Sequence, residues 1–286
     1  FKLARKWLEE AARLNNAEAQ YYMALLYLYG MGVEKDMDTS LYWLIKSGGQ
    51  GYRKALLKFV ELHYIISVNE GRENKITEVD KTKYSDFQRE LGKMFLNGSD
   101  KNDYIKAFTW LNMAAKHGDL IAGYYLGVMY EQGKATDRKP EKAFELILPA
   151  AEQGYVNAQN YLGYMYENGI GIDADMVKAT DWYDKAAGHG YIPAIIRLAE
   201  IYNNQGEGSK ALNLLCLAAD MGDYPSQKRL IKYFEKTGDY DQLFNYRYKA
   251  AVSGDYAEQH ELVLMYKKGQ GIPMIYRSGS KGPRFQ

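Results

Sequence analysis

The chain has 286 residues, of which 47% are hydrophobic and 26% are charged, and its formal net charge is +1. This near-neutral balance argues against a dedicated nucleic-acid-binding protein, which normally carries a basic excess. The single cysteine, Cys216, excludes an intrachain disulfide and a cysteine-rich metal site. No stretch approaches the roughly 18 consecutive apolar residues of a transmembrane helix, so we expect no membrane span.

The chain begins inside a predicted helix at Phe1, so we expect that its natural start has been trimmed. A signal peptide could have been lost with it, and the residues themselves therefore do not indicate a compartment.

An aromatic residue recurs along the chain at intervals of 32 to 36 residues. The series is Tyr27, Phe95, Tyr130, Tyr166, Tyr202, Phe234 and Tyr266, with His63 in the remaining position. In the copy that contains Tyr166, the residues Ala158, Leu162 and Met165 precede it at helical spacing and form one apolar stripe. Each copy is therefore predicted to contain a helix, here named helix A.

A second series alternates with the first and consists of Trp7, Trp43, Trp110, Leu146, Trp182, Leu214 and Tyr246. Each member precedes a small residue by four positions, and most of these small residues open an Ala-Ala pair such as Ala186-Ala187. This pattern predicts a second helix, named helix B. Because a helix pair this short cannot bury its apolar stripe alone, neighbouring pairs must stack. We predict an all-α fold, a right-handed α/α superhelical solenoid of about seven to eight helix-pair repeats.

Two positions of helix A predict how the pairs pack. The position of Leu162 holds a large apolar side chain in every other copy, namely Met23, Phe59, Leu91, Leu126, Leu198, Leu230 and Leu262. The next position holds Gly92, Gly127, Gly163, Ala24 or Ala199 in five of them. Glycine inside a helix costs about 1 kcal/mol relative to alanine, so we expect close helix contact at this position.

The stretch Gly169-Ile170-Gly171 raises the question of a phosphate cradle, a cation loop or a simple bend. It recurs as Gly30-Met31-Gly32 and Gly269-Gln270-Gly271, each time just after helix A. A phosphate loop would need further glycine and usually a Lys-Ser/Thr pair, and neither follows. We predict a bend, with glycine ending helix A and Asp175 or Asp36 capping helix B.

With these residues in place, the chain resembles the Sel-one-like repeat family, helical relatives of the tetratricopeptide repeat. The match is most complete from Ala158 through Leu162-Gly163 and Tyr166 to Trp182-Tyr183 and Ala186-Ala187. The resemblance covers residues 1–272 and implies a single solenoid that serves as an adaptor or scaffold. It implies no enzyme activity and no cofactor, and it favours a periplasmic or cytoplasmic location in a bacterium.

Two segments depart from the family pattern. Residues 64–84 lack the turn glycines, the tryptophan and the Ala-Ala pair, so we predict an irregular segment there: a loop, a kink or a partner contact. Residues 273–286 have the composition of a disordered end or a cloning remnant.

Few residues offer chemistry. The histidines His63, His117, His189 and His260 lie in different copies and complete no metal site. We predict a packed His63 and helix-end positions for His117 and His189. Lys236-Thr237-Gly238 matches one motif of penicillin-interacting enzymes. The alternative function is therefore a peptidoglycan-related or β-lactam-binding weak hydrolase of the cell envelope, but we predict that the protein is not an enzyme.

Helix A is expected to line the concave side of the solenoid. Its predicted partner-binding residues are Tyr21, Leu25, Leu28, Leu57, Tyr64, Tyr124, Val128 and Tyr164. Exposed tyrosine and leucine suit protein recognition, whereas the alternative is that these side chains pack against neighbouring helices. The predicted partner is another protein: an effector, a toxin or an envelope component. Two roles stay open, a passive adaptor and an antagonist that wraps an effector, and an apolar start of the groove leaves self-association open.

Overall fold

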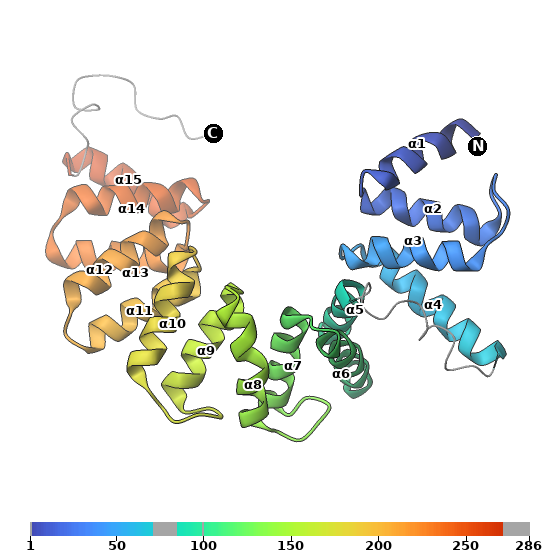
Figure 1. Ribbon diagram of the computed structural model, residues 1–286. Coiled ribbons are helices and arrows are strands. Elements are labelled where there is room, and N and C mark those ends of the chain that lie inside the picture. Colours follow the sequence, from blue (N-terminus) through green and yellow to red (C-terminus); the bar gives the residue numbers. More distant parts are fainter. Residues whose placement is uncertain (1, 71–84, 99, 271–286) are drawn as a thin grey trace. The chain divides into compact units, whose positions relative to one another are not determined.

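The computed structural model describes residues 2–70, 85–98 and 100–270, and it describes side chains for residues 5–62, 85–98 and 100–270. Within these residues all regular structure is α-helical, as predicted (Figure 1). The chain divides into two compact units, Phe1–Asp175 and Met176–Gln286. The prediction of one solenoid through residues 1–272 depends on the junction between the units and stays a prediction.

The helices alternate between the two predicted types, with one exception after α4. The A helices are α2 (Ala17–Tyr29), α4 (Arg53–Glu70), α5 (Ser85–Leu96), α7 (Leu120–Gln132), α9 (Val156–Asn168), α11 (Ile192–Asn204), α13 (Tyr224–Thr237) and α15 (Tyr256–Lys268). The B helices are α1 (Lys2–Arg13), α3 (Met37–Gly49), α6 (Lys101–Lys116), α8 (Pro140–Glu152), α10 (Met176–Gly188), α12 (Gly208–Asp220) and α14 (Tyr240–Val252).

Within each unit, consecutive helices pack side by side and share an apolar core. In the first unit, for example, α8 lies between α7 and α9, and in the second unit α12 lies between α11 and α13. The Leu162 position is buried in every copy, with side-chain exposure of at most 2% from Met23 to Leu262. The predicted core position of helix A is therefore confirmed.

The glycine positions inside helix A mark close helix contacts, as predicted. A Cβ atom on Gly127 would lie 2.6 Å from Cγ1 of Ile147 on α8, and one on Gly92 would lie 2.6 Å from Cγ of Leu111 on α6. A side chain at either position would push the paired B helix away, so the close contact offsets the low helix propensity of glycine.

The Gly-x-Gly stretch is a bend. Gly169 has a φ of +64° and ends α9, and its backbone N–H donates to the carbonyl of Met165. Ile170, between the two glycines, is buried. At the start of α3, the side chain of Asp36 accepts hydrogen bonds from the backbone N–H groups of Asp38 and Thr39. The turn and the cap at Asp36 are therefore confirmed.

A glutamine on helix A joins neighbouring repeats in a way that the sequence reading missed. Its side-chain Nε2 donates to the carbonyl of the second alanine of the preceding Ala-Ala pair, eight residues earlier, at 3.0–3.2 Å. The pairs are Gln20 with Ala12, Gln159 with Ala151, Gln227 with Ala219, and Gln259 with Ala251. Each of these carbonyls also accepts from the backbone N–H three residues further on, so the glutamine adds a second hydrogen bond to it from the neighbouring helix.

Replacing Gln159 with methionine, which keeps the length of the side chain but has no donor, is expected to destabilise the fold by about 1 kcal/mol. The carbonyl of Ala151 also accepts from the backbone N–H of Gly154, so the loss is that of one neutral hydrogen bond. Urea unfolding followed by circular dichroism measures the change. Gln259→Met is the matched variant at a less buried glutamine, where the loss of stability should be smaller. A larger loss there than at Gln159 would contradict the view that burial strengthens this hydrogen bond.

A buried ion pair interrupts the apolar core at the end of the second unit. Arg247 on α14 lies at the position that follows the Trp position, which elsewhere holds the buried residues Leu44, Leu111, Ile147 and Tyr183. Its Nε lies 3.2 Å from Oε2 of Glu258 on α15, which takes the place of Ala158. Both side chains are about nine-tenths buried, and the pair is not aligned as a hydrogen bond. Glu235, Glu261 and Lys228 complete the ion-pair network.

The segment predicted as irregular begins as a helix. The backbone of residues 64–70 continues α4 to Glu70, and this run contains no glycine of the kind that ends α2, α7 and α9. This corrects the prediction for those residues, whereas residues 71–84 and the predicted tail at 273–286 lie outside the described residues. After the gap, α5 packs against both α3 and α4. Its Phe87 ring lies 4.6 Å from the ring of Phe59, and a Cβ atom on Gly48 of α3 would lie 2.7 Å from Cε2 of Phe87.

Candidate functional site

Five tyrosines from α7, α9 and the turn between α8 and α9 form one aromatic group in the first unit. We name it the tyrosine cluster: Tyr124, Tyr125, Tyr155, Tyr161 and Tyr164. The ring of Tyr124 is central, with centroids 5.1 Å from Tyr125, 5.2 Å from Tyr155 and 6.0 Å from Tyr161. Tyr164 extends the group from Tyr161 at 5.7 Å, and its side chain is 42% exposed. The cluster therefore combines rings that are fixed by edge-to-face packing with one ring that faces solvent.

Hydrogen bonds fix the polar ends of the half-buried rings. The hydroxyl of Tyr161 donates to Oε2 of Glu131 at 3.0 Å, and the hydroxyls of Tyr125 and Tyr155 lie 3.4 Å apart. Burial and the Glu131 carboxylate raise the pKa of Tyr161, and burial and the hydrogen bond with Tyr155 raise the pKa of Tyr125. Both phenols therefore stay protonated at neutral pH, so they act as hydrogen-bond donors and packing surface rather than as bases.

Tyr124 and Tyr164 are the predicted binding residues that the structure brings together. Val128, one helical turn after Tyr124, is half-buried on α7. Leu57 on α4 is 49% exposed and lines a separate hollow with Lys93 and Met94 of α5. The side chain of the remaining aromatic, Tyr64, lies outside the described residues.

At the start of the unit, Tyr21 and Leu25 are half-buried and pack against the core that α2, α3, α4 and α5 share. Tyr21 also contacts the ring of Tyr52 at a centroid distance of 5.5 Å. Leu28 is 6% exposed and belongs to that core, so its prediction as a surface residue was wrong. The reason is that α2 is covered on more than one side: Met23 and Leu26 pack toward α1, while Leu28 packs toward the next helices.

Tyr125, Tyr155 and Tyr161 were missed by the sequence reading. Tyr125 and Tyr161 occupy the same position in adjacent copies, one residue after the position of Tyr124. Tyr155 precedes helix A, as Tyr52 precedes α4. A search for recurring tyrosines at that neighbouring position would have found two of the three. A charged neighbour of the cluster was missed as well. The Nζ of Lys93, on the A helix α5, lies 5.8 Å from the ring centroid of Tyr125.

The residues with potential chemistry have structural roles where the structure describes them. Lys236-Thr237-Gly238 ends α13: Gly238 has a φ of +77°, and the Thr237 hydroxyl donates to the carbonyl of Tyr233. His117 ends α6, as predicted, and its Nδ1 lies 3.1 Å from Oε1 of Gln88. His189 lies just after α10, and the side chain of His63 lies outside the described part of the chain. Ser278 and Lys281, which have S-x-x-K spacing, also lie outside it.

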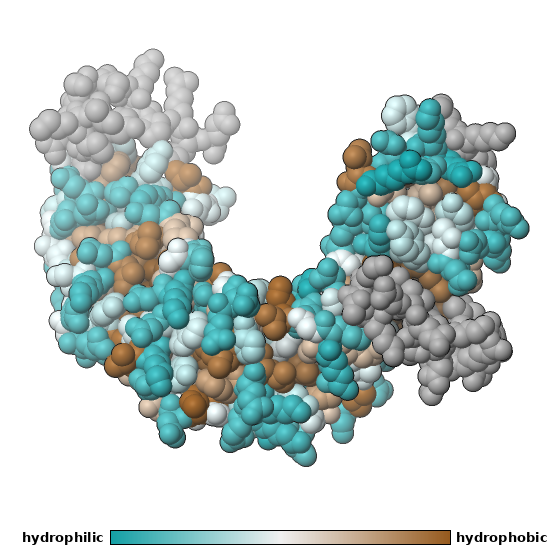
Figure 2. Space-filling view, viewed as in Figure 1, coloured by the Kyte–Doolittle hydropathy of each residue, from teal (hydrophilic) through white to brown (hydrophobic). Residues whose placement is uncertain are grey.

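Among the described residues, no group of three or more His, Cys, Asp or Glu side chains is placed to hold a metal ion. None of the helices in that same part of the chain has the length and hydropathy needed to span a bilayer. On the face shown in Figure 2, hydrophilic side chains cover most of the described surface, and apolar side chains form small separate groups.

The alternating A and B helices, the glycine-ended turns and the shared core define the class of protein: this is an α/α helical-repeat protein. The chain belongs to the Sel1 repeat family. The family model matches residues 1–16, 17–52, 85–119, 121–155, 156–191 and 192–223. The gap between the matches at residues 53–84 contains α4 and the departure from the repeat pattern.

Similar solved structures are also Sel1 repeat proteins. One, from Oxalobacter formigenes, is 26% identical, with 92% of this chain and 81% of that chain covered and a TM-score of 0.55. A protective antigen of uropathogenic Escherichia coli is 22% identical over 93% of this chain and 68% of its own, with a TM-score of 0.38. An immunity protein of Pseudomonas aeruginosa is 20% identical over 61% of this chain and 67% of its own, with a TM-score of 0.42. Comparison with curated proteins gave no match.

Proposed function

We propose that this protein is a non-enzymatic scaffold that binds a partner protein through the A-helix side of its first unit, with the tyrosine cluster at the centre of the contact. Sel1 repeats are typically protein-interaction modules. The observation that carries the proposal is the arrangement of the cluster: four rings are held in place by mutual contacts, and they present Tyr164 to solvent on a helix rather than on a loop.

A fixed aromatic platform favours binding because little side-chain entropy is lost when a partner covers it. Tyrosine supplies a large apolar area and a polar tip with few rotatable bonds, and it is enriched among the residues that dominate binding energy. Leu57 and the half-buried Tyr21 and Leu25 would extend the contact toward the start of the unit. Their partner would be an effector, a toxin or an envelope component.

Photo-cross-linking from the cluster tests the proposal directly. p-Benzoylphenylalanine at position 164 is expected to cross-link a partner in lysate of the native host, and mass spectrometry then identifies the attached peptide. Tyr42 on the B helix α3 is the matched control, because its side chain is also 42% exposed. Equal cross-linking from positions 42 and 164, or none from 164, would count against this surface.

Truncation of Tyr164 gives the quantitative form of the same test. Tyr164→Ala is expected to weaken partner binding by about tenfold or more, while Tyr42→Ala changes it less than about twofold. Neither change should move the thermal midpoint, because each ring is substantially exposed. Tyr124→Ala is a poorer probe, since loss of three ring contacts would also cost stability.

The adaptor and antagonist roles differ in what binding does to the partner. An antagonist abolishes its partner's activity at stoichiometric ratio, whereas an adaptor leaves it active and links it to a third protein. Assay of the cross-linked partner with and without this protein separates the two roles. The envelope-hydrolase alternative predicts turnover or covalent capture of a fluorescent penicillin, which a scaffold would not show.

A further inference from the structure

The sequence contains two Asn-Gly pairs, Asn97-Gly98 and Asn168-Gly169. In such a pair the backbone nitrogen of the glycine can attack the side-chain amide carbon of the asparagine, because glycine has no side chain to obstruct the approach. Each pair lies where an A helix ends: Asn97 directly follows α5, and Asn168 is the last residue of α9. Both asparagines are exposed, so sequence and exposure alone do not distinguish them.

Hydrogen bonds hold both reacting groups of the second pair in place. The Nδ2 of Asn168 donates to the carbonyl of Tyr164 at 2.9 Å. The backbone N–H of Gly169, the group that would attack, donates to the carbonyl of Met165 where α9 ends. Closing a ring between Asn168 and Gly169 would therefore break two hydrogen bonds and loosen the last turn of the helix. We expect this pair to be protected by the fold.

The first pair is held less firmly. Within the part of the chain that the structure describes, the side chain of Asn97 has no hydrogen-bond partner. The backbone N–H of Gly98 donates to the carbonyl of Phe95, three residues earlier, at 3.0 Å. A bond across three residues has poorer geometry than the α-helical bond at Gly169. Ring closure at Asn97 thus breaks one hydrogen bond, which lies beyond the last residue of α5, Leu96.

We propose that Asn97 is a site of spontaneous deamidation, whereas the fold protects Asn168. The nitrogen of Gly98 forms a bond to Cγ of Asn97, the Cγ–Nδ2 bond breaks, and ammonia leaves with the proton of the glycine amide. The product is a cyclic imide. Water then adds to one of the two imide carbonyls and opens the ring, which gives aspartate or isoaspartate at position 97. Water is the co-reactant, and the reaction consumes no oxidant or reductant.

Conversion adds a negative charge to the surface beside α4 and α5. Asn97 lines a hollow there together with Leu57 and Asp103. A Cβ atom on Gly98 would overlap the carboxylate of Asp103, so the new carboxylate forms close to a like charge, which it repels. Leu57 belongs to the proposed partner contact, and the charge beside that contact would therefore change as the protein ages. This consequence rests on the proposed function, whereas the conversion itself does not.

Peptide mass spectrometry of the full-length protein tests the proposal without any partner, so its failure would leave the proposed function untouched. The protein is incubated in mildly alkaline water enriched in heavy oxygen, which labels each residue converted during the incubation. Conversion at Asn97 is expected to be about fivefold faster than at Asn168, because ring closure at Asn168 breaks one more hydrogen bond. In protein unfolded with urea, the two rates should agree within about twofold, because these hydrogen bonds are lost. Equal rates in the folded protein, or an equally strong preference for Asn97 in urea, would overturn the proposal.

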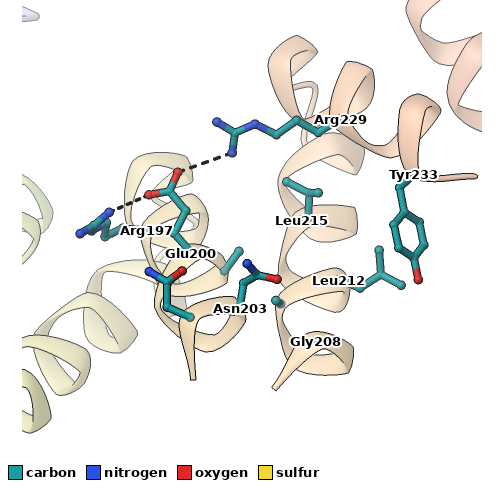
Figure 3. A pocket seen from close by; sticks show the side chains of 11 residues that line it. Arg197, Glu200, Asn203, Gly208, Leu212, Leu215, Arg229 and Tyr233 are labelled. Carbon is teal, nitrogen blue, oxygen red and sulfur yellow. Dashed lines mark hydrogen bonds and ion pairs between the residues drawn. The ribbon is translucent and has the colours of Figure 1, made fainter. Parts of the chain in front are cut away.

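Asn203 on α11 is an internal control for the role of the glycine. It is exposed, as Asn97 is, and it lines a hollow between α11, α12 and α13 (Figure 3). The residue that follows it is Asn204 rather than glycine, so its backbone approach is obstructed by a side chain. Asn203 should stay unconverted while Asn97 reacts. Conversion of Asn203 at the rate of Asn97 would show that exposure alone decides, which would contradict the assignment.

Discussion

Replacing Arg247 with leucine is expected to destabilise the C-terminal helices α13 to α15 by about 3 kcal/mol or more, even though leucine is the residue found there in other repeats. The variant leaves the buried carboxylate of Glu258 without its nearest guanidinium. It also leaves Glu235 and Glu261 without the cation that they share with Glu258. Lys228 offsets part of the loss, because its Nζ also contacts Glu258.

The double replacement of Arg247 by leucine and Glu258 by alanine should recover most of that loss. It restores the apolar pair that α6 and α7 carry at the equivalent positions as Leu111 and Ala122. Removing both partners of a buried ion pair is often neutral or even stabilising, whereas removing one is costly. The two changes should therefore be strongly non-additive, with a final stability within about 1 kcal/mol of the wild type.

Hydrogen exchange of the α13, α14 and α15 amides measures this effect locally, which suits a repeat chain whose parts unfold with different free energies. Glu261→Gln is the control: it changes a carboxylate whose side chain is 44% exposed, and it should cost less than about 1 kcal/mol. If the double variant were less stable than Arg247→Leu alone, the buried pair would not be the origin of the effect.

The second large effect is expected at Gly171, where alanine should cost about 3 kcal/mol of unfolding free energy. The residue has a φ of +69°, which an L-residue with a side chain adopts only with strain. A Cβ atom there would also lie 2.1 Å from the carbonyl oxygen of Pro140, at the start of α8. Because that neighbour is backbone, the turn after α9 would have to move away from α8.

Gly169 provides the matched control within the same turn. Its φ is +64°, but a Cβ atom there would come no closer than 3.4 Å to Ala174. Gly169→Ala should therefore cost only the backbone strain, about 1 kcal/mol, and the difference between the two variants isolates the contact with Pro140. Urea unfolding of both proteins gives this difference. Equal losses would mean that the turn moves away from α8 without cost.

The repeat itself, including its core, could be predicted from the sequence because the same physical requirement recurs in each copy. A large apolar residue at the Leu162 position indicates which face of helix A is buried. The small residue after it indicates where the paired helices approach closely, as at Gly92 and Gly127. Periodicity also predicted the bend at Gly169, since a helix that ends in a left-handed residue favours glycine.

Features that depend on one particular neighbour could not be predicted. Leu28 occupies a position that holds a glutamate in the copy containing Leu162. Only the packing of α2 between several helices makes Leu28 a core residue. Arg247 and Glu258 are single departures in two different helices, and their pairing becomes visible only when the helices are placed together. Similarly, the tyrosine cluster draws its rings from α7, α9 and a turn, so no single segment contains the pattern.

The glutamine that reaches back to the alanine carbonyl has a consequence for how such a chain can change its length. Gln159 and Gln227 find the same acceptor, because each follows an Ala-Ala pair at a fixed interval of eight residues. Excision or duplication of one whole period, such as the 36 residues from Tyr130 to Tyr166, would regenerate an equivalent junction with its polar groups satisfied. A change inside the eight-residue interval itself would separate the glutamine from its acceptor, so the architecture favours growth and shrinkage in units that keep this interval whole.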